Sequence, residues 1–157
     1  MQTRLLPASV VTEQTAITDV VDAVEDAFGA YARGDVQMPA KSYIDLPQYN
    51  GDFRSMPAYL DAGEWDAAAI KWVNVHPDNE EKFGLPTVMG TIVYSDPETA
   101  FPLALIDGTT VTRLRTGAAA AVATRHLAHE DADSLGLVGA GTQAYTQLEA
   151  ISTVRDI

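Results

Sequence analysis

Apolar residues recur at helical spacing near the start of the chain. Over residues 12–33 they fall three or four positions apart, at Ile17, Val20, Val21, Val24, Phe28 and Tyr31. This spacing places them on one face of an α-helix. Thr12 or Thr15 could cap the start of this helix, and Gly34 could end it. A second helix is predicted over residues 109–128, where an alanine-rich centre suits close packing.

Between these helices the pattern becomes typical of β-strands. Extended segments are predicted at residues 38–46, 53–60, 67–75, 85–94 and 101–106. A turn at Asn50, Gly51 and Asp52 separates the first two, and Pro57 marks a strand end or edge. A turn at residues 95–98 joins the last two into a hairpin. Strands flanked by helices predict an α+β domain with a mixed sheet.

The pattern changes again after residue 130. Residues 134–138 (SLGLV) predict a short buried strand, followed by a glycine-rich turn and a helix to about residue 153. This order is the opening of a dinucleotide-binding βαβ unit. We therefore predict an α+β domain over residues 1–130 and the start of an α/β Rossmann domain over residues 131–157. No second strand follows, so this nucleotide domain is expected to be truncated.

The glycine-rich turn is a candidate phosphate site. Gly139 allows a tight turn, and Gly141 allows the backbone N–H groups at the start of the helix to approach an anion closely. Ala144 stands where the usual pattern has a third glycine, and it still permits close packing of helix and strand. The alternative is a plain strand-to-helix turn that binds nothing.

The charge of the chain excludes several classes of partner. With 22 acidic and 10 basic residues, the formal net charge is -12, which argues against binding nucleic acid or an anionic membrane surface. Cysteine is absent, so disulfides and cysteine-ligated metals are excluded. Abundant aspartate and alanine with only 3 lysines indicate a halophilic protein. An ordinary acidic protein is the alternative.

No apolar run reaches the roughly 20 residues that a membrane span needs. The first six residues also lack the basic region and long apolar core of a signal peptide. A cytoplasmic location is therefore predicted.

The scarcity of lysine draws attention to the three that are present. Lys41 and Lys71 lie in predicted strands, whereas Lys82 lies in a polar loop. Alternation places Lys71 on one face with Ala69 and Val73, so it could point into the domain. There it could bind a carboxylate, or act in acid–base or imine chemistry if desolvation lowers its pKa. A lysine at a strand edge, with its amine in solvent, is the alternative.

Three arginines are further candidates, because a guanidinium can grip a carboxylate with two parallel hydrogen bonds. They are Arg54, Arg113 and Arg115. The last two stand two residues apart on a predicted helix, so they face nearly opposite ways and only one is expected to enter a site. Surface ion pairs are the alternative. His76, His126 and His129 have no carboxylate pattern around them, so no metal site is predicted.

Three motifs, in this order, resemble the ornithine cyclodeaminase/mu-crystallin family and its archaeal alanine dehydrogenase branch. They are KWVNVHP at residues 71–77, RTGA at residues 115–118 and GAGTQA at residues 139–144. The resemblance implies a domain that binds substrate and forms a homodimer through its sheet, followed by a Rossmann domain that carries NAD. Members of the family are longer than this chain.

The resemblance also implies roles for particular residues. Lys71 falls at the active-site lysine, and Arg115 falls at the arginine that grips the substrate carboxylate. Lys41 and Arg54 fall at positions that line the substrate pocket. Nucleotide contacts are implied for Thr116, Gly139, Ala140, Gly141, Thr142 and Gln143.

The activity implied is NAD-dependent oxidation of a small 2-amino acid, namely alanine to pyruvate and ammonia. Ornithine cyclodeaminases tend to carry an acid where Arg54 stands, and an arginine there would repel a second substrate amine. Ornithine cyclodeaminase and ketimine reductase chemistry remain alternatives on the same scaffold. A further alternative is a truncated, non-catalytic module that binds a ligand or dimerises, as in mu-crystallin.

Overall fold

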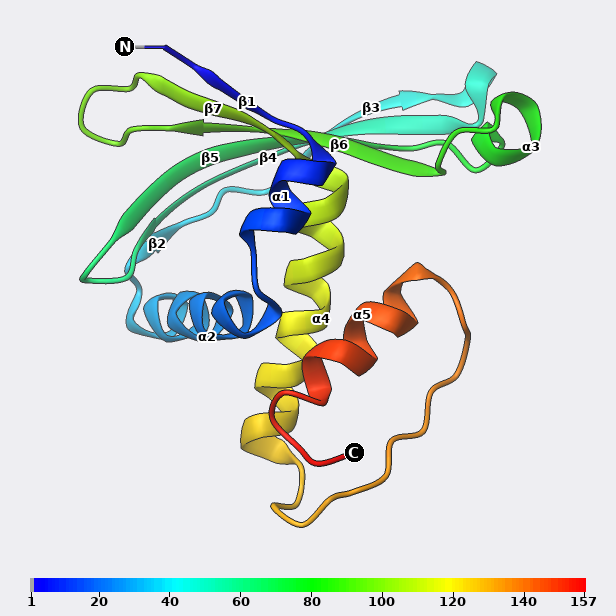
Figure 1. The fold of residues 1–157 in the computed structure, drawn as a ribbon. Helices are drawn as coiled ribbons and strands as arrows, with labels where there is room; N and C mark the ends of the chain where they lie inside the picture. Colours follow the sequence, from blue (N-terminus) through cyan, green and yellow to red (C-terminus); the bar gives the residue numbers. More distant parts are fainter. Residues whose placement is uncertain (1) are drawn as a thin grey trace.

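A computed structural model describes residues 2–157 as a curved sheet above a group of helices (Figure 1). The strands are β1 (Arg4–Leu6), β2 (Val36–Gln37), β3 (Ser42–Leu46), β4 (Gly51–Asp61), β5 (Asp66–Val75), β6 (Val88–Ser95) and β7 (Pro102–Asp107). The helices are α1 (Ala8–Gln14), α2 (Ile17–Arg33), α3 (Asn79–Phe83), α4 (Gly108–Leu127) and α5 (Thr142–Ile151), with a 3₁₀ turn at Pro47–Tyr49.

The sheet is mixed, as predicted. Its strand order is β1-β7-β6-β5-β4-β2, and β3 pairs with another part of β4. All pairs are antiparallel except β1 with β7. The predicted hairpin is confirmed as β6–β7. Strand β1 was not predicted, because three residues are too few to show an alternating pattern.

Pro57 was predicted to mark a strand end or an edge. It lies inside β4, away from either end of the strand. On one side of β4, β3 pairs only as far as Ser55 and β2 begins pairing at Tyr59. Pro57 therefore lies at a local edge between these two partners. Proline has no backbone N–H, but no hydrogen bond is lost at this edge, because neither β2 nor β3 pairs with residue 57.

The first predicted helix is wrong in its extent, because it is two helices. Thr15 and Ala16 have extended backbone conformations between α1 and α2. Neither threonine caps the start of α2: its N-cap is Ala16, which provides no side-chain cap, and Thr15 instead follows the end of α1. Gly34 ends α2 as predicted, with φ at 87° and its N–H directed to the carbonyls of Ala30 and Tyr31.

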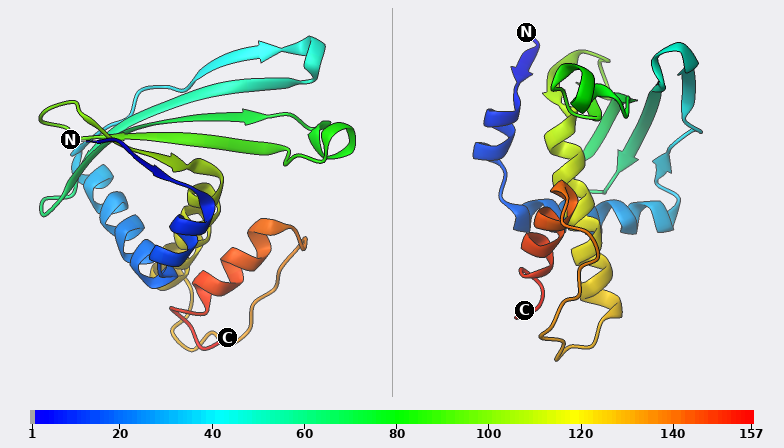
Figure 2. Two further views of the ribbon diagram at one scale, coloured as in Figure 1. Left: turned by 45° about the horizontal axis from the view of Figure 1, so that its top comes forward. Right: turned by 90° about the vertical axis from the view of Figure 1, so that its right-hand side faces the viewer.

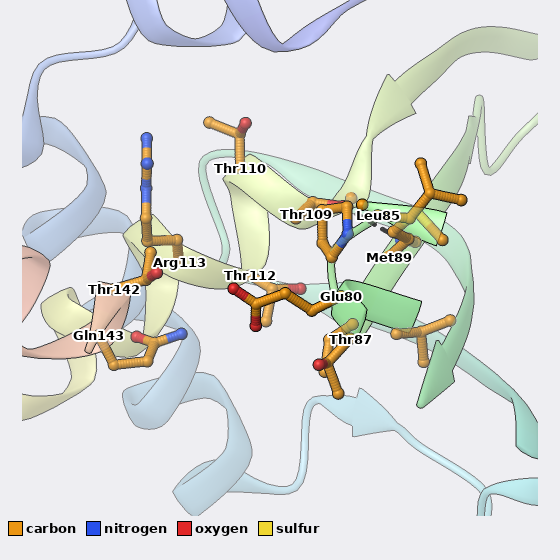
Figure 3. A pocket seen from close by; sticks show the side chains of 16 residues that line it. Glu80, Leu85, Thr87, Met89, Thr109, Thr110, Thr112, Arg113, Thr142 and Gln143 are labelled. Carbon is orange, nitrogen blue, oxygen red and sulfur yellow. Dashed lines mark hydrogen bonds between the residues drawn. The ribbon is translucent and has the colours of Figure 1, made fainter. Parts of the chain in front are cut away.

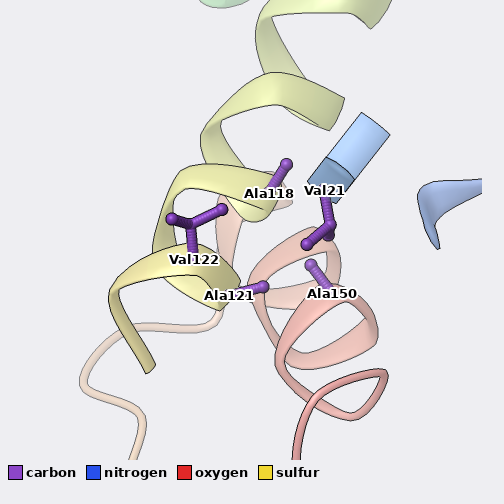
Figure 4. Packing of buried hydrophobic residues seen from close by; sticks show 5 residues of the cluster. All are labelled: Val21, Ala118, Ala121, Val122 and Ala150. Carbon is purple, nitrogen blue, oxygen red and sulfur yellow. The ribbon is translucent and has the colours of Figure 1, made fainter. Parts of the chain in front are cut away.

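Helix α4 descends from the sheet and packs between α2 and α5 (Figures 1 and 2). The shared core consists mainly of small residues, namely Val21, Ala118, Ala121, Val122 and Ala150 (Figure 4). A Cβ added to Gly117 of α4 would lie 2.5 Å from the backbone oxygen of Thr146 in α5. The alanine-rich centre of α4 therefore serves the close packing that its composition predicted.

The carboxyl end of α4 is capped by a distant arginine. The Nη2 of Arg155 donates to the carbonyl oxygens of Thr124 and Ala128, at 3.1 and 3.0 Å, and its Nε donates to that of His129 at 3.0 Å. A positive charge at a helix carboxyl end also complements the helix dipole. This contact ties the segment after α5 to α4.

The strand predicted at residues 134–138 is wrong. These residues adopt no regular structure, and Val138 is fully exposed. A strand needs a neighbour to pair its backbone groups, and no strand within residues 2–157 lies beside this segment. The turn and α5 form without it, so only part of the Rossmann opening is present. The division at residue 130 stays a prediction.

Within residues 2–157, no helix combines the length and the apolar character needed to cross a membrane.

Substituting Gly117 with alanine should destabilise the protein by about 1–3 kcal/mol, because the new methyl group would overlap the backbone of α5. Urea unfolding followed by circular dichroism measures this change. Gly29→Ala in α2 is the matched control. Its new Cβ would meet only the flexible end of Arg33 at 3.2 Å, so we expect no loss. Equal stability of the two variants would contradict the packing argument.

Candidate active site

The sheet face that looks toward α4 carries Lys71 near its centre. On the neighbouring strands, Met56 of β4 and Ile92 of β6 stand opposite this lysine. Because both neighbours are apolar, the aliphatic part of Lys71 is covered on two sides. Its Nζ reaches α4 and donates a hydrogen bond to the Thr112 Oγ1, at 3.1 Å. Lys71 thus points into the domain, as alternation along the strand suggested.

The surroundings of Lys71 favour its neutral form. Burial lowers the pKa of its amine, and the positive charges of Arg115 and Lys41 lower that pKa further. No carboxylate of residues 2–157 forms an ion pair with any of these three cations. The structure therefore brings together three residues that the sequence singled out. A cluster of unpaired cations of this kind attracts a small anion.

Arg54 lies on the same face of the sheet but already has a partner. Its Nε and Nη2 donate to the two carboxylate oxygens of Asp52, at 2.9 and 2.7 Å. Its guanidinium also lies over the Tyr43 ring, 5.4 Å from the centroid. The hydrogen bonds from Arg54 hold the pKa of Asp52 below its usual value. The structure thus holds Arg54 in an ion pair, the alternative for this arginine, but the pair is partly buried rather than at the surface.

A cavity of about 800 Å³ opens between β6, the start of α4 and the start of α5 (Figure 3). Thr112, Arg113, Thr142 and Gln143 line it, and so does Glu80 of α3, whose carboxylate points inward. Thr112 therefore faces both this cavity and Lys71. Thr112 and Glu80 were not predicted from the sequence; the only signal for Thr112 was a run of threonines at the start of α4.

The two arginines of the TRLRT segment lie in different surroundings, and of the two only Arg113 lines a cavity. Arg115 lies close enough to Lys71 to affect its pKa. Arg113 lines the large cavity and a second one of about 560 Å³, which Ala140, Gly141 and Thr142 also line. Helix α4 thus has candidate site residues on two sides, toward the sheet at Arg115 and toward α5 at Arg113.

The glycine-rich turn is open to a ligand. Gly139 has a φ of 96°, which favours glycine, and a Cβ at Gly139 or Gly141 would meet no atom within 4 Å. Backbone N–H groups at the start of α5 are thus accessible, which fits the phosphate part of a dinucleotide. Thr116 lies apart from both cavities, and its hydroxyl donates to the carbonyl of Thr112 at 2.7 Å.

No group of three histidine, aspartate or glutamate side chains within residues 2–157 is placed to hold a metal ion.

Comparison with known proteins assigns the chain to a family. Residues 1–157 match the model of the ornithine cyclodeaminase/mu-crystallin family. The chain belongs to this family. Its α+β fold with a mixed sheet agrees with the fold of solved relatives.

Individual members of the ornithine cyclodeaminase/mu-crystallin family resemble the whole chain. The alanine dehydrogenase of Archaeoglobus fulgidus is 46% identical over 157 residues, covering 100% of this chain and 47% of that protein. A solved archaeal alanine dehydrogenase dimer with bound NAD superposes with a TM-score of 0.92, over 100% of this chain and 47% of the other.

A third relative has a different activity in its name. The Delta(1)-pyrroline-2-carboxylate reductase of Thermococcus litoralis, solved with NADH and L-proline, is 41% identical with a TM-score of 0.90. The match covers 98% of this chain and 47% of that one. The chain thus spans about half the length of the family members that it matches.

Substituting Lys71 with methionine should raise the free energy of unfolding at neutral pH. The lowered pKa means that the folded state disfavours the charged amine, and this cost is present in full below the folded pKa. This destabilisation disappears as pH rises from the folded pKa toward 10.5, the ordinary pKa of lysine. The stability gained by Lys71→Met should therefore shrink over that range. Urea unfolding across this pH range measures it.

Lys82→Met is the control for that experiment. Lys82 is exposed and pairs with Asp78 at 2.7 Å, so its loss should change stability by less than about 1 kcal/mol. If the increase in the free energy of unfolding for Lys71→Met stayed constant with pH, the charge on the Lys71 amine would not be what destabilises the folded state.

Proposed function

We propose that the complete protein is an NAD-dependent oxidoreductase that converts alanine, or a similarly small 2-amino acid, to the 2-oxo acid and ammonia. The observation that carries this proposal is the cluster of Lys71, Lys41 and Arg115. Lys71 donates a hydrogen bond to Thr112, which lines the large cavity together with Thr142 and Gln143 of the glycine-rich segment. The 46% identity to an alanine dehydrogenase supports the choice of substrate.

In this proposal, Arg115 and Lys41 bind the substrate carboxylate. Neither has a carboxylate partner within residues 2–157, so an incoming anion relieves their mutual repulsion with Lys71. Arg54 contributes less to binding, because Asp52 engages two of its nitrogens. Its positive charge still disfavours substrates that bring a second amine.

Lys71 moves the proton in the proposed reaction. Oxidation of the amino acid leaves a 2-imino acid, and water must then add to the imine carbon. The neutral Lys71 amine accepts a proton from that water as the new C–O bond forms, and returns it to the nitrogen that leaves as ammonia. A lowered pKa suits this role, because it increases the neutral fraction at working pH.

The nucleotide would be held by Gly139, Ala140, Gly141, Thr142 and Gln143 at the start of α5, and the family resemblance also implies a contact from Thr116 of α4. When bound, NAD supplies the acceptor for the hydride from the substrate Cα. The open approach at Gly139 and Gly141 supports this assignment for the pyrophosphate.

Imine reduction is the second candidate function. The likeness to a pyrroline-2-carboxylate reductase favours it, since that relative matches nearly as well as the alanine dehydrogenases. The same cations would bind the carboxylate of a cyclic imine, and Lys71 would then donate its proton to the imine nitrogen.

A homodimer formed through the outer face of the sheet is also proposed. Apolar side chains on the face opposite Lys71 are exposed, including Ile44, Ile70, Trp72 and Leu105. An exposed apolar surface of this kind is typical of an interface. The solved archaeal relative, which is a dimer, supports this assignment.

The complete gene product should form NADH when given L-alanine and NAD. Replacing Lys71 with alanine should lower kcat by at least about a hundredfold, because the base is removed. Replacing Arg115 with leucine should mainly raise the KM for the amino acid. Absorbance of NADH measures both, in low and in high KCl, since we also propose that the charge of -12 reflects a high-salt cytoplasm.

Lys82→Ala is the matched lysine control and should keep its turnover, because Lys82 is a surface residue. A panel of alanine, ornithine and, with NADH, a cyclic 2-imino acid separates the two candidate reactions. Full turnover in Lys71→Ala would refute the proposed role of this lysine, whichever substrate is used.

Replacing Ile70 with aspartate should dissociate the proposed dimer, raising its Kd by at least about a hundredfold, because a charge would be buried at the interface. Light scattering after size-exclusion chromatography measures the mass. Tyr31→Asp is the control, since Tyr31 is exposed on α2, on the other side of the sheet. A dimer that survived Ile70→Asp would place the interface elsewhere.

A further inference from the structure

The start of α4 is fixed against the sheet by three adjacent residues. Asp107 caps the helix, its Oδ1 accepting from the backbone N–H of Thr110 at 2.7 Å. Gly108 lies so close to Gly90 of β6 that a Cβ there would stand 2.9 Å from its backbone. The Thr109 hydroxyl accepts from the Gly90 N–H at 3.2 Å. The first turn of α4 therefore has one position relative to β6 and β5.

This placement brings one hydroxyl to the amine of Lys71. Thr112, one turn into α4, accepts from Nζ at 3.1 Å, and no other hydrogen bond of Nζ is found within residues 2–157. The residues opposite Lys71 on β4 and β6 are Met56 and Ile92, which have no strong acceptor. The charged groups that face the amine, Lys41 and Arg115, are both cations.

We propose that Thr112 is a positioning residue, whose hydroxyl holds the Lys71 amine at the wall of the large cavity. Thr112 lines that cavity, whereas Lys71 does not, so the hydroxyl of Thr112 joins the amine, 3.1 Å away, to the cavity wall. This inference rests on the proposed function, because it assumes that Lys71 transfers the proton. It adds a residue that neither the motifs nor the family resemblance indicated.

The hydroxyl has two physical effects on the amine. It restricts a flexible four-carbon side chain to one orientation, which matters because proton transfer requires a short and well-aligned contact. It also solvates the charged form of an amine that otherwise faces only cations and apolar groups. Removing it should therefore displace the amine and lower the pKa of Lys71 further.

The test replaces Thr112 with valine, which keeps the shape, and with serine, which keeps the hydroxyl, in the complete protein. Thr112→Val should lower kcat about tenfold with little change in the KM for the amino acid, a loss typical of one hydrogen bond to a charged group. The limb of the pH–kcat profile that belongs to Lys71 should move to lower pH. Thr112→Ser should restore both.

A second readout does not need turnover. The rate at which an amine-reactive reagent labels Lys71, followed by peptide mass spectrometry without substrate, should rise at lower pH in Thr112→Val than in the unsubstituted protein. Thr124→Val is the matched control, because Thr124 lies on the same helix and its hydroxyl donates to the helix carbonyl of Ala120 at 2.8 Å.

The outcomes separate this inference from the proposed function. If Lys71→Ala abolishes turnover but Thr112→Val leaves kcat, the pH profile and labelling unchanged, the positioning role is wrong and the proposed function stands. If Lys71→Ala keeps full turnover, the proposed function fails first. A loss that serine does not restore would assign Thr112 a packing role and overturn the inference.

Discussion

The close approach of α4 to three neighbours is the constraint on which the rest of the structure depends. Small residues make it possible at each contact: Gly108 meets the sheet, Gly117 meets α5, and Ala118 and Ala121 join the core with α2 and α5. Because protein interiors are close-packed, a larger side chain at these points would separate the layers. Thr112, Arg113 and Arg115 of the candidate active site lie on this helix, so their positions follow from its packing, whereas Lys41 and the glycine-rich turn lie in loops.

The distribution of charge explains why the site attracts an anion in a strongly acidic protein. Most other basic side chains are paired: Arg33, Arg54, Lys82 and Arg125 all have carboxylate partners. The cluster of Lys41, Lys71 and Arg115 has none within residues 2–157, and Lys71 is partly buried as well. The repulsion between these positive charges is unfavourable in the free protein. Functional sites retain such clusters because an anionic ligand relieves the repulsion.

Much of the fold could be predicted, and the errors have common physical causes. Periodicity located α2 and most strands, because each buries one face in a regular repeat. The alanine-rich stretch located α4, and the turn at residues 95–98 located the β6–β7 hairpin. It missed β1, which is three residues long, and the break at Thr15 and Ala16, where no glycine or proline marks a helix end. The strand at residues 134–138 failed for another reason: its composition suits a buried strand, but no partner strand pairs with it.

The sequence by itself determined the family, the mixed α+β fold and the identity of the cations at the candidate site, since these depend on local pattern and on motifs. Only the tertiary structure decided which cations are free. It paired Arg54 with Asp52, placed Arg113 beside the glycine-rich turn and set Thr112 against Lys71. Those contacts join residues from different elements, and their distances depend on how closely α4 packs against the sheet and α5, which no pattern along one chain can specify.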